Sequence, residues 1–546
     1  MRWGVIVFRS LVGRPRTLLI ALLAAGAAAL LTLGAAVVGS VYEGTRRSII
    51  ESGAGHLQLY SEASANPPVA IPGPGGVPDL EPIKGYAEAE KVVRAVPGVK
   101  DLVPMELGEA QLFRGNYLDV RLQSLRRLVS QPASPEREAA VARMVPDLRR
   151  VLEQVARDGR QRDVIFTTGK AAQEDQRAIE TATTDAFWER FRTDPFEGLE
   201  YIENRVSKQL GEGESAAMSF IGTEVSQFAS AFPRIQLVSG ALPPPGKRGI
   251  LLGKGFHEAT FKLPIAQRLD EISRAREGGG GLATDERLRT LLDRNAQELP
   301  YLLLTLDVVR AEAARATLSR LLGRQGELEP LLRDFLAVDD ANFDERYRLF
   351  YAELAPHLPI YRVMPGDTLM LQSGTGSVRI PVRVYGTFRF VGLGSDQDRV
   401  NTVNLVDPIT AQFLAMRQTR AQAEEARALI SQFDLPPVPA ADELELSPAT
   451  VEDARPIAPS VTDALSIEVQ KPPETFTRAD VEAGGVLQAA VVLEPGAEPD
   501  RVAHALSERL RASGLPVKTA GWQEVGGFVG QVVELSRVAF FVAALV

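Results

Sequence analysis

The segment closest to a known chemical motif is RGILLGKGF (248–256), which carries glycines and a lysine. Loops of the form G-x-x-x-x-G-K-[ST] hold phosphate groups with their backbone N–H groups. Here only three residues separate Gly249 from Gly253, and no Ser or Thr follows Lys254. A second segment, FTTGKAA (166–172), lacks the first glycine. We therefore interpret 248–256 as a strand that leaves a turn.

Other residue types that do chemistry are scarce. The chain has no cysteine, which excludes disulfides, thiolate metal sites and Cys nucleophiles. Its four histidines show no pair at ligand spacing, so a His-based metal site is not expected. Neither H-E-x-x-H nor G-x-S-x-G occurs, and acidic pairs such as Asp339-Asp340 fall on predicted helical surfaces. The sequence thus predicts a non-catalytic protein with no catalytic, cofactor-binding or metal residues, no cofactor, and a substrate site that stays unknown.

Length and composition are those of a folded, multidomain protein. The 546 residues are 45% hydrophobic and 24% charged, which is ordinary for globular domains. The net charge of −9 argues against a general nucleic-acid surface. The elements that would position a site are therefore inferred from the pattern of apolar and polar segments along the chain.

The N-terminal region carries the strongest physical signal. No charged residue occurs from Thr17 to Tyr42, a stretch of 26 positions. As a helix it would be about 39 Å long, enough to span a bilayer core of roughly 30 Å. Four arginines precede it: Arg2, Arg9, Arg14 and Arg16. The positive-inside rule therefore places the N-terminus in the cytoplasm and the following residues outside.

Two alternatives concern this region. A cleaved signal peptide would use small residues near Val37-Val38-Gly39, but its apolar part would be about 7 to 15 residues long. We therefore predict an uncleaved transmembrane helix over 17–42. In residues 1–16, three arginines spaced by seven favour an amphipathic segment on the cytoplasmic leaflet. A basic flank with incidental apolar residues explains 1–16 equally well.

Both ends of the exported region have an α/β pattern. Alternating or apolar runs predict strands, and stripes ended by Pro or Gly predict helices. The predicted strands are GHLQLY (55–60), YLDVRLQ (117–123), LQAAVVLE (487–494) and LPVKTA (515–520), and the predicted helices are YAEAEKVVRAV (86–96) and EPDRVAHALSERLRASG (498–514). We expect one small sheet built from 43–125 and 462–525, so that both membrane segments lie under the same domain.

The middle of the chain combines a β-rich block with helices. VRIPVRVYGTFRF (378–390) alternates with period two over its whole length, a strong strand pattern. The predicted segments are a β-rich block over 214–265 and 359–432, helical inserts over 126–213 and 266–358, a Pro-rich acidic loop over 433–461, and the start of a second transmembrane helix over 526–546. The predicted fold class is a membrane-anchored α/β (α+β) protein with mixed sheets.

The order of these features resembles the MacB/LolC/LolE/FtsX-like permeases of ABC transporters. The segments that resemble the family are RPRTLLIALLAAG (14–26), GAGHLQLYSEA (53–63), VPGVKDLVPMELGEAQL (96–112), SFIGTEVSQFASAF (219–232), VSGALPPPGKRGILLGKGFHEAT (238–260), PGDTLMLQ (365–372), VRVYGTFRF (382–390) and VKTAGWQEVGGFVGQVVELSRVAFFVAALV (517–546). No single motif is specific, so the resemblance rests on their order. The two helical inserts depart from the family pattern.

The resemblance implies a membrane subunit without catalytic activity of its own. Family members have four membrane helices and a large extracytoplasmic domain between the first and second, so we expect this chain to be truncated within the second. The implied partners are a cytoplasmic ABC ATPase, a second permease subunit (identical or related), the lipid bilayer, and a periplasmic carrier or lipoprotein. The implied location is the bacterial inner membrane, and the implied work is export or extraction of lipoproteins, peptides or lipids.

Two other functions fit the same pattern. A sensor receptor would also place an α/β ligand domain between two membrane helices. A single-pass exported scaffold or binding protein would instead bury the apolar run Val538–Val546 within its soluble domain. Two further apolar spans would favour the permease, and a charged cytoplasmic coiled coil would favour the sensor.

Overall fold

The computed structural model describes residues 15–70, 76–113, 117–166, 170–207, 215–374, 378–392, 399–417, 468–469, 472–526 and 535. The chain divides into two compact units. Unit 1 comprises Met1–Ala110, Met218–Gly255 and Gln372–Val546, and unit 2 comprises Gln111–Ala217 and Phe256–Leu371. Three predicted segments lie wholly or largely outside the described residues: 1–16, 433–461 and 526–546.

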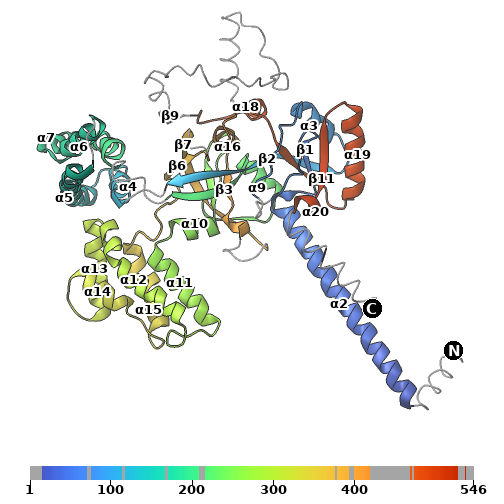
Figure 1. Ribbon diagram of the computed structural model, residues 1–546, viewed down its shortest axis with the longest axis horizontal. Coiled ribbons are helices and arrows are strands. Elements are labelled where there is room, and N and C mark those ends of the chain that lie inside the picture. Colours follow the sequence, from blue (N-terminus) through green and yellow to red (C-terminus); the bar gives the residue numbers. More distant parts are fainter. Residues whose placement is uncertain are drawn as a thin grey trace, which may run out of the picture. The chain divides into compact units, whose positions relative to one another are not determined.

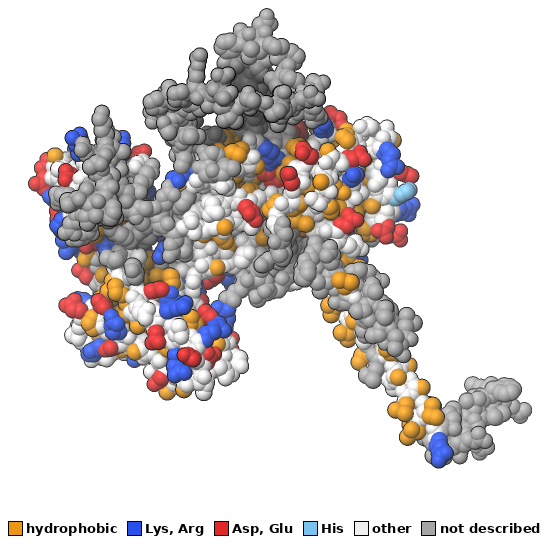
Figure 2. All heavy atoms as spheres, viewed as in Figure 1, with side chains coloured by type: hydrophobic (Ala, Val, Ile, Leu, Met, Phe, Trp, Pro, Cys, Tyr) orange, Lys and Arg blue, Asp and Glu red, His pale blue; other side chains and the backbone are white. Residues whose placement is uncertain are grey.

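Unit 1 begins with the long helix α2 (Pro15–Ile49), which continues into the π-helical turn η1 (Ile50–Ala54). Among the described helices, one, covering Leu22–Ala54, is long and apolar enough to cross a membrane. Many large apolar side chains of α2 are exposed (Figure 2). They are Leu19, Ile20, Leu22, Leu23, Leu31, Leu33, Val37 and Val41.

A mixed sheet forms the centre of unit 1 (Figure 1). Its strands are β1 (Leu57–Ser61), β2 (Val99–Phe113), β3 (Ser215–Thr223), β4 (Ile235–Gly240), β5 (Ile250–Gly253), β7 (Val378–Phe390), β8 (Asn404–Val406), β9 (Glu468–Val469), β10 (Gln488–Leu493) and β11 (Val517–Gly521). Neighbouring strands follow the order β11-β1-β10-β2-β3-β8-β5-β7-β4, and β9 pairs with β7. The helices of this unit are α3 (Tyr86–Arg94), α9 (Val225–Ala231), η6 (Arg399–Thr402), α16 (Pro408–Leu414), α18 (Arg478–Ala483), α19 (Pro499–Ala512) and α20 (Trp522–Val525).

The two ends of the predicted exported region build the same sheet. β1 lies between two C-terminal strands, and it pairs antiparallel with both: Leu57 is opposite Val491 of β10 and also opposite Gly521 of β11. β10 in turn pairs antiparallel with β2. The prediction that both ends share one sheet is confirmed. The sheet is not small, however, because it continues through β2 and β3 into the middle block.

β10 shows how both faces of this sheet are covered. Ala489, Val491 and Leu493 pack with apolar residues of α3 and α19, whereas Ala490 and Val492 pack with residues of α9. Successive strand residues point to opposite faces, so a strand buried on both faces must be apolar throughout. This explains why QAAVVL contains no alternation of apolar and polar residues.

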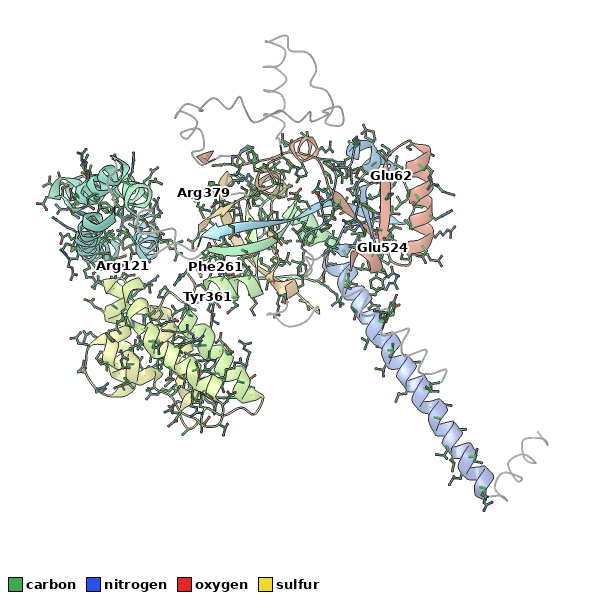
Figure 3. The ribbon with its side chains drawn as sticks, viewed as in Figure 1. Glu62, Arg121, Phe261, Tyr361, Arg379 and Glu524 are labelled. Atoms are coloured by element: carbon green, nitrogen blue, oxygen red, sulfur yellow. The ribbon has the colours of Figure 1, made fainter. Side chains whose placement is uncertain are left out.

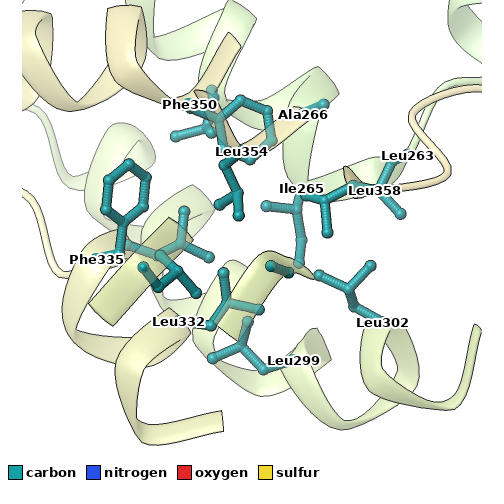
Figure 4. Close-up of a cluster of buried hydrophobic side chains, with 14 of the residues drawn as sticks. Leu263, Ile265, Ala266, Leu299, Leu302, Leu332, Phe335, Phe350, Leu354 and Leu358 are labelled. Atoms are coloured by element: carbon teal, nitrogen blue, oxygen red, sulfur yellow. The ribbon is translucent and has the colours of Figure 1, made fainter. Parts of the chain in front are cut away.

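Unit 2 consists largely of helices around two apolar clusters. The helices are α4 (Tyr117–Val129), α5 (Pro135–Phe166), α6 (Lys170–Thr183), α7 (Asp185–Thr193), α8 (Pro195–Tyr201), η2 (Ile202–Val206), α10 (Lys254–Phe261), α11 (Pro264–Glu277), α12 (Glu286–Thr305), α13 (Val308–Leu322), α14 (Leu328–Leu336), α15 (Phe343–Leu349), η4 (Phe350–Leu354) and η5 (Ala355–His357), followed by the strand β6 (Thr368–Gln372). Leucines and phenylalanines of α11 to η4 interlock in the larger cluster (Figure 4). The smaller cluster joins α4 to η2.

A polar network fixes the start of the second helical segment. The Lys262 ammonium pairs with Glu258 at 3.0 Å and with Asp270. The Tyr361 hydroxyl donates to Glu258 at 2.6 Å, and Tyr361 lies close to Phe261 (Figure 3). Burial, and then the hydrogen bond to Glu258, raise the pKa of Tyr361. The carboxylates that pair with Lys262 among the described residues thus belong to its own helical segment, which favours a structural role.

One predicted element and three segment boundaries differ in the structure. The prediction of a strand over 117–123 is wrong, because these residues begin helix α4. The spacing Leu118, Leu122, Leu125 and Val129 places four buried residues on one helical stripe, and this stripe packs into the smaller cluster of unit 2. Unit 1 accordingly ends its first segment at Ala110 rather than at residue 125. Unit 2 also begins its second segment at Phe256, before residue 266, and extends to Leu371, beyond residue 358.

The larger cluster of unit 2 gives a test of packing. Leu354 is fully buried there, so we expect Leu354→Ala to lower the free energy of unfolding by about 2–5 kcal/mol. Leu242→Ala is the matched control, because Leu242 is 40% exposed, and should change it by less than about 0.5 kcal/mol. Urea denaturation followed by circular dichroism measures both. Equal midpoints for the two variants would contradict the assignment of this core.

Candidate functional site

The glycine- and lysine-containing segment 248–256 forms the buried strand β5 and the start of α10. The Gly249 N–H donates to Asp407 at 3.0 Å, and the Gly253 N–H donates to the Asn404 side chain at 3.0 Å. A Cβ on Gly253 would lie 2.4 Å from the Val403 carbonyl oxygen. These glycines therefore allow close packing inside the sheet, in agreement with the prediction of a strand.

The first candidate site is the junction between α2 and the sheet. We define the junction as the buried apolar cluster of Ile49, Ile50, Ala54, Ala70, Ala520, Trp522 and Val525, with Tyr42 packed against it. The rings of Tyr42 and Trp522 meet edge to face, with centroids 5.5 Å apart. The last turns of α2 are therefore packed against α20, the last described helix before the predicted second membrane segment.

The turn from η1 into β1 is tightly held. Gly55 has φ 66° and ψ −177°, a conformation essentially restricted to glycine. Its N–H donates to the Ile50 carbonyl at 3.1 Å, and the next N–H, of His56, donates to the Val491 carbonyl at 2.9 Å. A Cβ on Gly55 would lie 2.9 Å from that Val491 oxygen, which belongs to the backbone of the neighbouring strand and has little room to shift. The helix thus enters the sheet through one rigid turn.

Polar contacts tie the same helix end to the opposite side of the sheet. Arg234, just before β4, donates to Glu51 at 2.7 Å and to the Val391 carbonyl at 3.0 Å. The Ser48 hydroxyl donates to the Gly392 carbonyl at 3.0 Å, just beyond β7. The base of α2 is therefore fastened to both ends of the strand order, by apolar packing near β11 and by hydrogen bonds near β4.

The second candidate site is a cavity of about 280 Å³ beside β2. Its lining comes from α3, β2, the end of β3, α9, α16 and α18. The apolar lining residues are Leu102, Pro104, Met105, Pro245, Pro408, Phe476, Val481, Val486 and Leu487. A largely apolar hollow with a few polar groups is the usual form of a small-molecule site, and this volume lies near the lower end of their range.

Most charged groups of the cavity are paired with a group of opposite charge. Glu90 is only 4% exposed, and its carboxylate pairs with Arg94 at 2.6 Å and with Arg478. Glu106, also buried, pairs with Arg417, which donates to the Gly485 carbonyl at 2.7 Å. A buried carboxylate left without a cation would be costly, so these pairs hold the walls together.

Two buried polar atoms of the lining residues have no hydrogen-bond partner among the described residues. They are the hydroxyl of Tyr86, which is 7% exposed, and Oε1 of Gln412, which is 2% exposed. The Gln412 Nε2 is satisfied, because it donates to the Val481 carbonyl at 2.8 Å. Burial raises the pKa of Tyr86, while Arg478 and Arg94 act in the opposite direction. The phenol therefore stays neutral and able to donate.

The helix that carries Gln412 is anchored by a buried acid. Asp407 accepts hydrogen bonds from the Thr410 N–H at 2.8 Å and the Thr410 hydroxyl at 2.7 Å, and so caps α16. Burial raises the pKa of Asp407, whereas the nearby Arg248 and the hydrogen bonds from Thr410 and Gly249 lower it. Arg248 donates to the Thr410 hydroxyl at 2.8 Å. These hydrogen bonds hold the start of α16, the helix that forms one wall of the cavity.

The two candidate sites consist of apolar packing, ion pairs and hydrogen bonds. Within the described ranges, no group of three or more His, Asp or Glu side chains could hold a metal ion. Comparison with protein family models, with curated proteins and with solved structures finds no match for this chain. The resemblance to the permease family therefore stays a prediction.

The sequence did not point to the cavity residues. They come from segments between Tyr86 and Leu487 that only the sheet brings together, and none carries a local motif. The junction had a weak signal, because Trp522 lies in one of the family-like segments. An aromatic residue directly before a predicted membrane segment is a candidate anchor.

The turn at Gly55 can be tested by adding one methyl group. We expect Gly55→Ala to lower the free energy of unfolding of unit 1 by about 1–3 kcal/mol, because the residue must keep a conformation that alanine avoids. Gly44→Ala is the matched control, since Gly44 lies within α2 with nothing within 4 Å of an added Cβ. It should stabilise the helix by about 0.5–1 kcal/mol. Hydrogen exchange of β1 amides measures the effect of Gly55→Ala, and that of α2 amides measures the effect of Gly44→Ala. Unchanged β1 protection in Gly55→Ala would refute the rigid turn.

The state of Tyr86 can be tested by alkaline titration. An unfolded tyrosine ionises at about pH 10, whereas folded Tyr86 keeps its proton at that pH, so folding stability falls as pH rises above about 10. The tyrosinate absorbance at about pH 10 should therefore be the same in the wild-type protein and in Tyr86→Phe. A wild-type excess of about half an ionised tyrosine at that pH would show that Tyr86 is solvated.

Proposed function

We propose that this chain is a permease subunit of an ABC transporter of the MacB/LolCE/FtsX type. In this role α2 is a transmembrane helix with its N-terminus in the cytoplasm, and the sheet and helical units lie on the extracytoplasmic side of a bacterial inner membrane. A separate cytoplasmic ATPase supplies the energy, and a second permease subunit, identical or related, completes the transporter. The cargo is a lipoprotein, a peptide or a lipid.

The observation that carries the proposal is the junction. A helix whose large apolar side chains are exposed is fastened at its end to the sheet by Trp522 packing, by the Gly55 turn and by the Arg234–Glu51 pair. An apolar surface of this length is stable in lipid and costly in water. A displacement of α2 in the membrane would therefore be passed to the sheet as a rigid-body movement.

The position of Trp522 supports coupling from two sides. Trp522 and Val525 directly precede the predicted second membrane segment, 526–546, and they pack against the end of α2. In the proposed subunit, the first and second membrane helices therefore enter the extracytoplasmic body at one place. A change in their relative tilt would act on the edge strands β1 and β11 together.

An α/β ligand domain between two membrane helices would also fit a sensor receptor. That function would require movement of the junction on binding of an extracytoplasmic ligand and no dependence on nucleotide. It would not require an ATPase partner. The two functions therefore differ in whether nucleotide or an extracytoplasmic ligand moves Trp522.

The proposal is tested with the protein expressed from its own gene and purified by an affinity tag into lipid nanodiscs. We expect an ATPase subunit to co-purify, and a non-hydrolysable ATP analogue to change the Trp522 emission, because this ring contacts Tyr42 of α2. Trp522→Phe should abolish the change. Tyr42→Ala, which removes an aromatic contact worth about 0.5–1.5 kcal/mol, should reduce it while the ATPase remains bound.

The outcome that overturns the proposal is a protein that purifies without an ATPase and whose Trp522 emission does not respond to nucleotide. A response to nucleotide that persists in Trp522→Phe would place the movement elsewhere, for example at Trp188, and would refute coupling through the junction.

A further inference from the structure

We propose that the cavity beside β2 binds a small organic cation, in which a primary ammonium group is attached to a short apolar chain. The carboxylate of Glu224 holds the ammonium group, and the apolar lining of the cavity holds the chain. The cavity lies in unit 1 and is distinct from the junction. The inference goes beyond the proposed transport function, because binding in this cavity needs no ATPase and no second subunit.

The lining of the cavity carries more negative than positive charge. Its charged side chains are four carboxylates and two guanidinium groups, those of Glu90, Glu106, Glu224, Glu482, Arg94 and Arg478. A third guanidinium group, that of Arg417, pairs with Glu106. Four carboxylates against three guanidinium groups leave one negative charge without a counterpart. The charge balance therefore favours a ligand with a single positive charge.

The two arginines of the lining are already shared between carboxylates. Arg94 contacts Glu90 at 2.6 Å and Asp101, which lies outside the lining, at 3.1 Å. Arg478 contacts Glu90 and, at 2.9 Å, Glu482. An anionic ligand would have to take one of these arginines from the buried Glu90, which would leave that carboxylate with a weaker partner. The ion pairs of the lining thus select against an anion.

Glu224 is the lining carboxylate that has no cationic partner among the described residues. It caps α9, because one of its oxygens accepts the Gln227 N–H and the other accepts the Ser226 hydroxyl, each at 2.6 Å. A carboxylate has about four lone-pair sites, so each oxygen can accept a further hydrogen bond. An ammonium group has three N–H donors, and its hydrogen bonds to a carboxylate are charge-assisted. The half-buried Glu224 is therefore a positioned acceptor for such a group.

The remaining lining defines the rest of the ligand. The side chains of Met105, Phe476 and Val486 offer an apolar wall, on which burial of an alkyl chain is favourable. A metal ion fits poorly, because hard metal cations take about six oxygen ligands. In the described ranges no three His, Asp or Glu side chains converge in a way that could hold one. The cavity thus fits an organic cation with an apolar chain.

The test uses hexylammonium as the probe, with hexanoate and hexanol as congeners that share its alkyl chain and carry a negative charge or none. The full chain in nanodiscs of zwitterionic lipid is titrated with each compound at about pH 7, where an alkylammonium group keeps its proton. Empty nanodiscs give the background, and saturation-transfer NMR reports the bound alkyl protons. We expect saturable binding of hexylammonium with a Kd of about 1 mM or lower, and binding of both congeners at least about tenfold weaker. No saturable binding of hexylammonium, or equally tight binding of either congener, would overturn the proposal.

Two variants of Glu224 and one control locate the site. Glu224→Gln keeps a capping oxygen but removes the charge, and should weaken hexylammonium binding by at least about tenfold through the loss of a charge-assisted hydrogen bond. Glu224→Asp keeps the charge and is a strong N-cap, so it should bind more tightly than Glu224→Gln. Glu62→Gln removes an exposed carboxylate just after β1 and outside the cavity (Figure 3), and should bind like the wild type. Wild-type affinity in Glu224→Gln would refute the assignment, and if that variant does not fold, the three compounds on the wild-type protein decide.

Discussion

The structure depends on how one exposed apolar helix is joined to a folded body. The large side chains of α2 are exposed over several turns, whereas Ile49 at its end and Ile50 at the start of η1 are buried. This change from exposed to buried takes place within a few residues of the ring contact between Tyr42 and Trp522. η1 and Gly55 then set the direction of β1, which pairs with both β10 and β11.

The two candidate sites use the same sheet in different ways. The junction uses its edge, where β11 and β1 meet the membrane-proximal helix, and the cavity uses the face of β2 that α3, α16 and α18 surround. Buried ion pairs such as Glu90–Arg94 are weak contributors to stability, but they fix geometry because an unpaired partner would be penalised strongly. Ion pairs therefore fix part of a largely apolar cavity wall, whereas the junction combines apolar packing with the Arg234–Glu51 pair.

Regular elements could be predicted from the sequence where the apolar residues fit only one periodicity, that of a strand or that of a helix. β7 matches the predicted 378–390, because its apolar residues alternate with Arg379, Arg383 and Arg389 over thirteen positions. The stripe Val502, Leu506 and Leu510 likewise predicted α19. The failure at 117–123 arose because Leu118 and Leu122 fit both a period of two and a helical stripe, and only packing within unit 2 decides between them.

The candidate sites were less predictable because they depend on distant pairing. The cavity needs Glu90, Glu106 and Gln412 side by side, and no spacing in the sequence connects them. The unpaired atoms of Tyr86 and Gln412 are properties of the packed state alone. The junction was predictable in part, since the end strands were expected to form one sheet, but the contact of Tyr42 with Trp522 required the coordinates.

The position of β1 has a consequence for biosynthesis. Its partner Val491 follows Leu57 by 491 − 57 = 434 residues. At about 5–20 residues per second, a ribosome needs roughly 20–90 s to supply that partner. During this time the strand has two unsatisfied edges, and such edges invite wrong pairing with other chains. A protein with such distant strand pairing folds slowly. Its first strand would benefit from a chaperone until β10 and β11 have been synthesised.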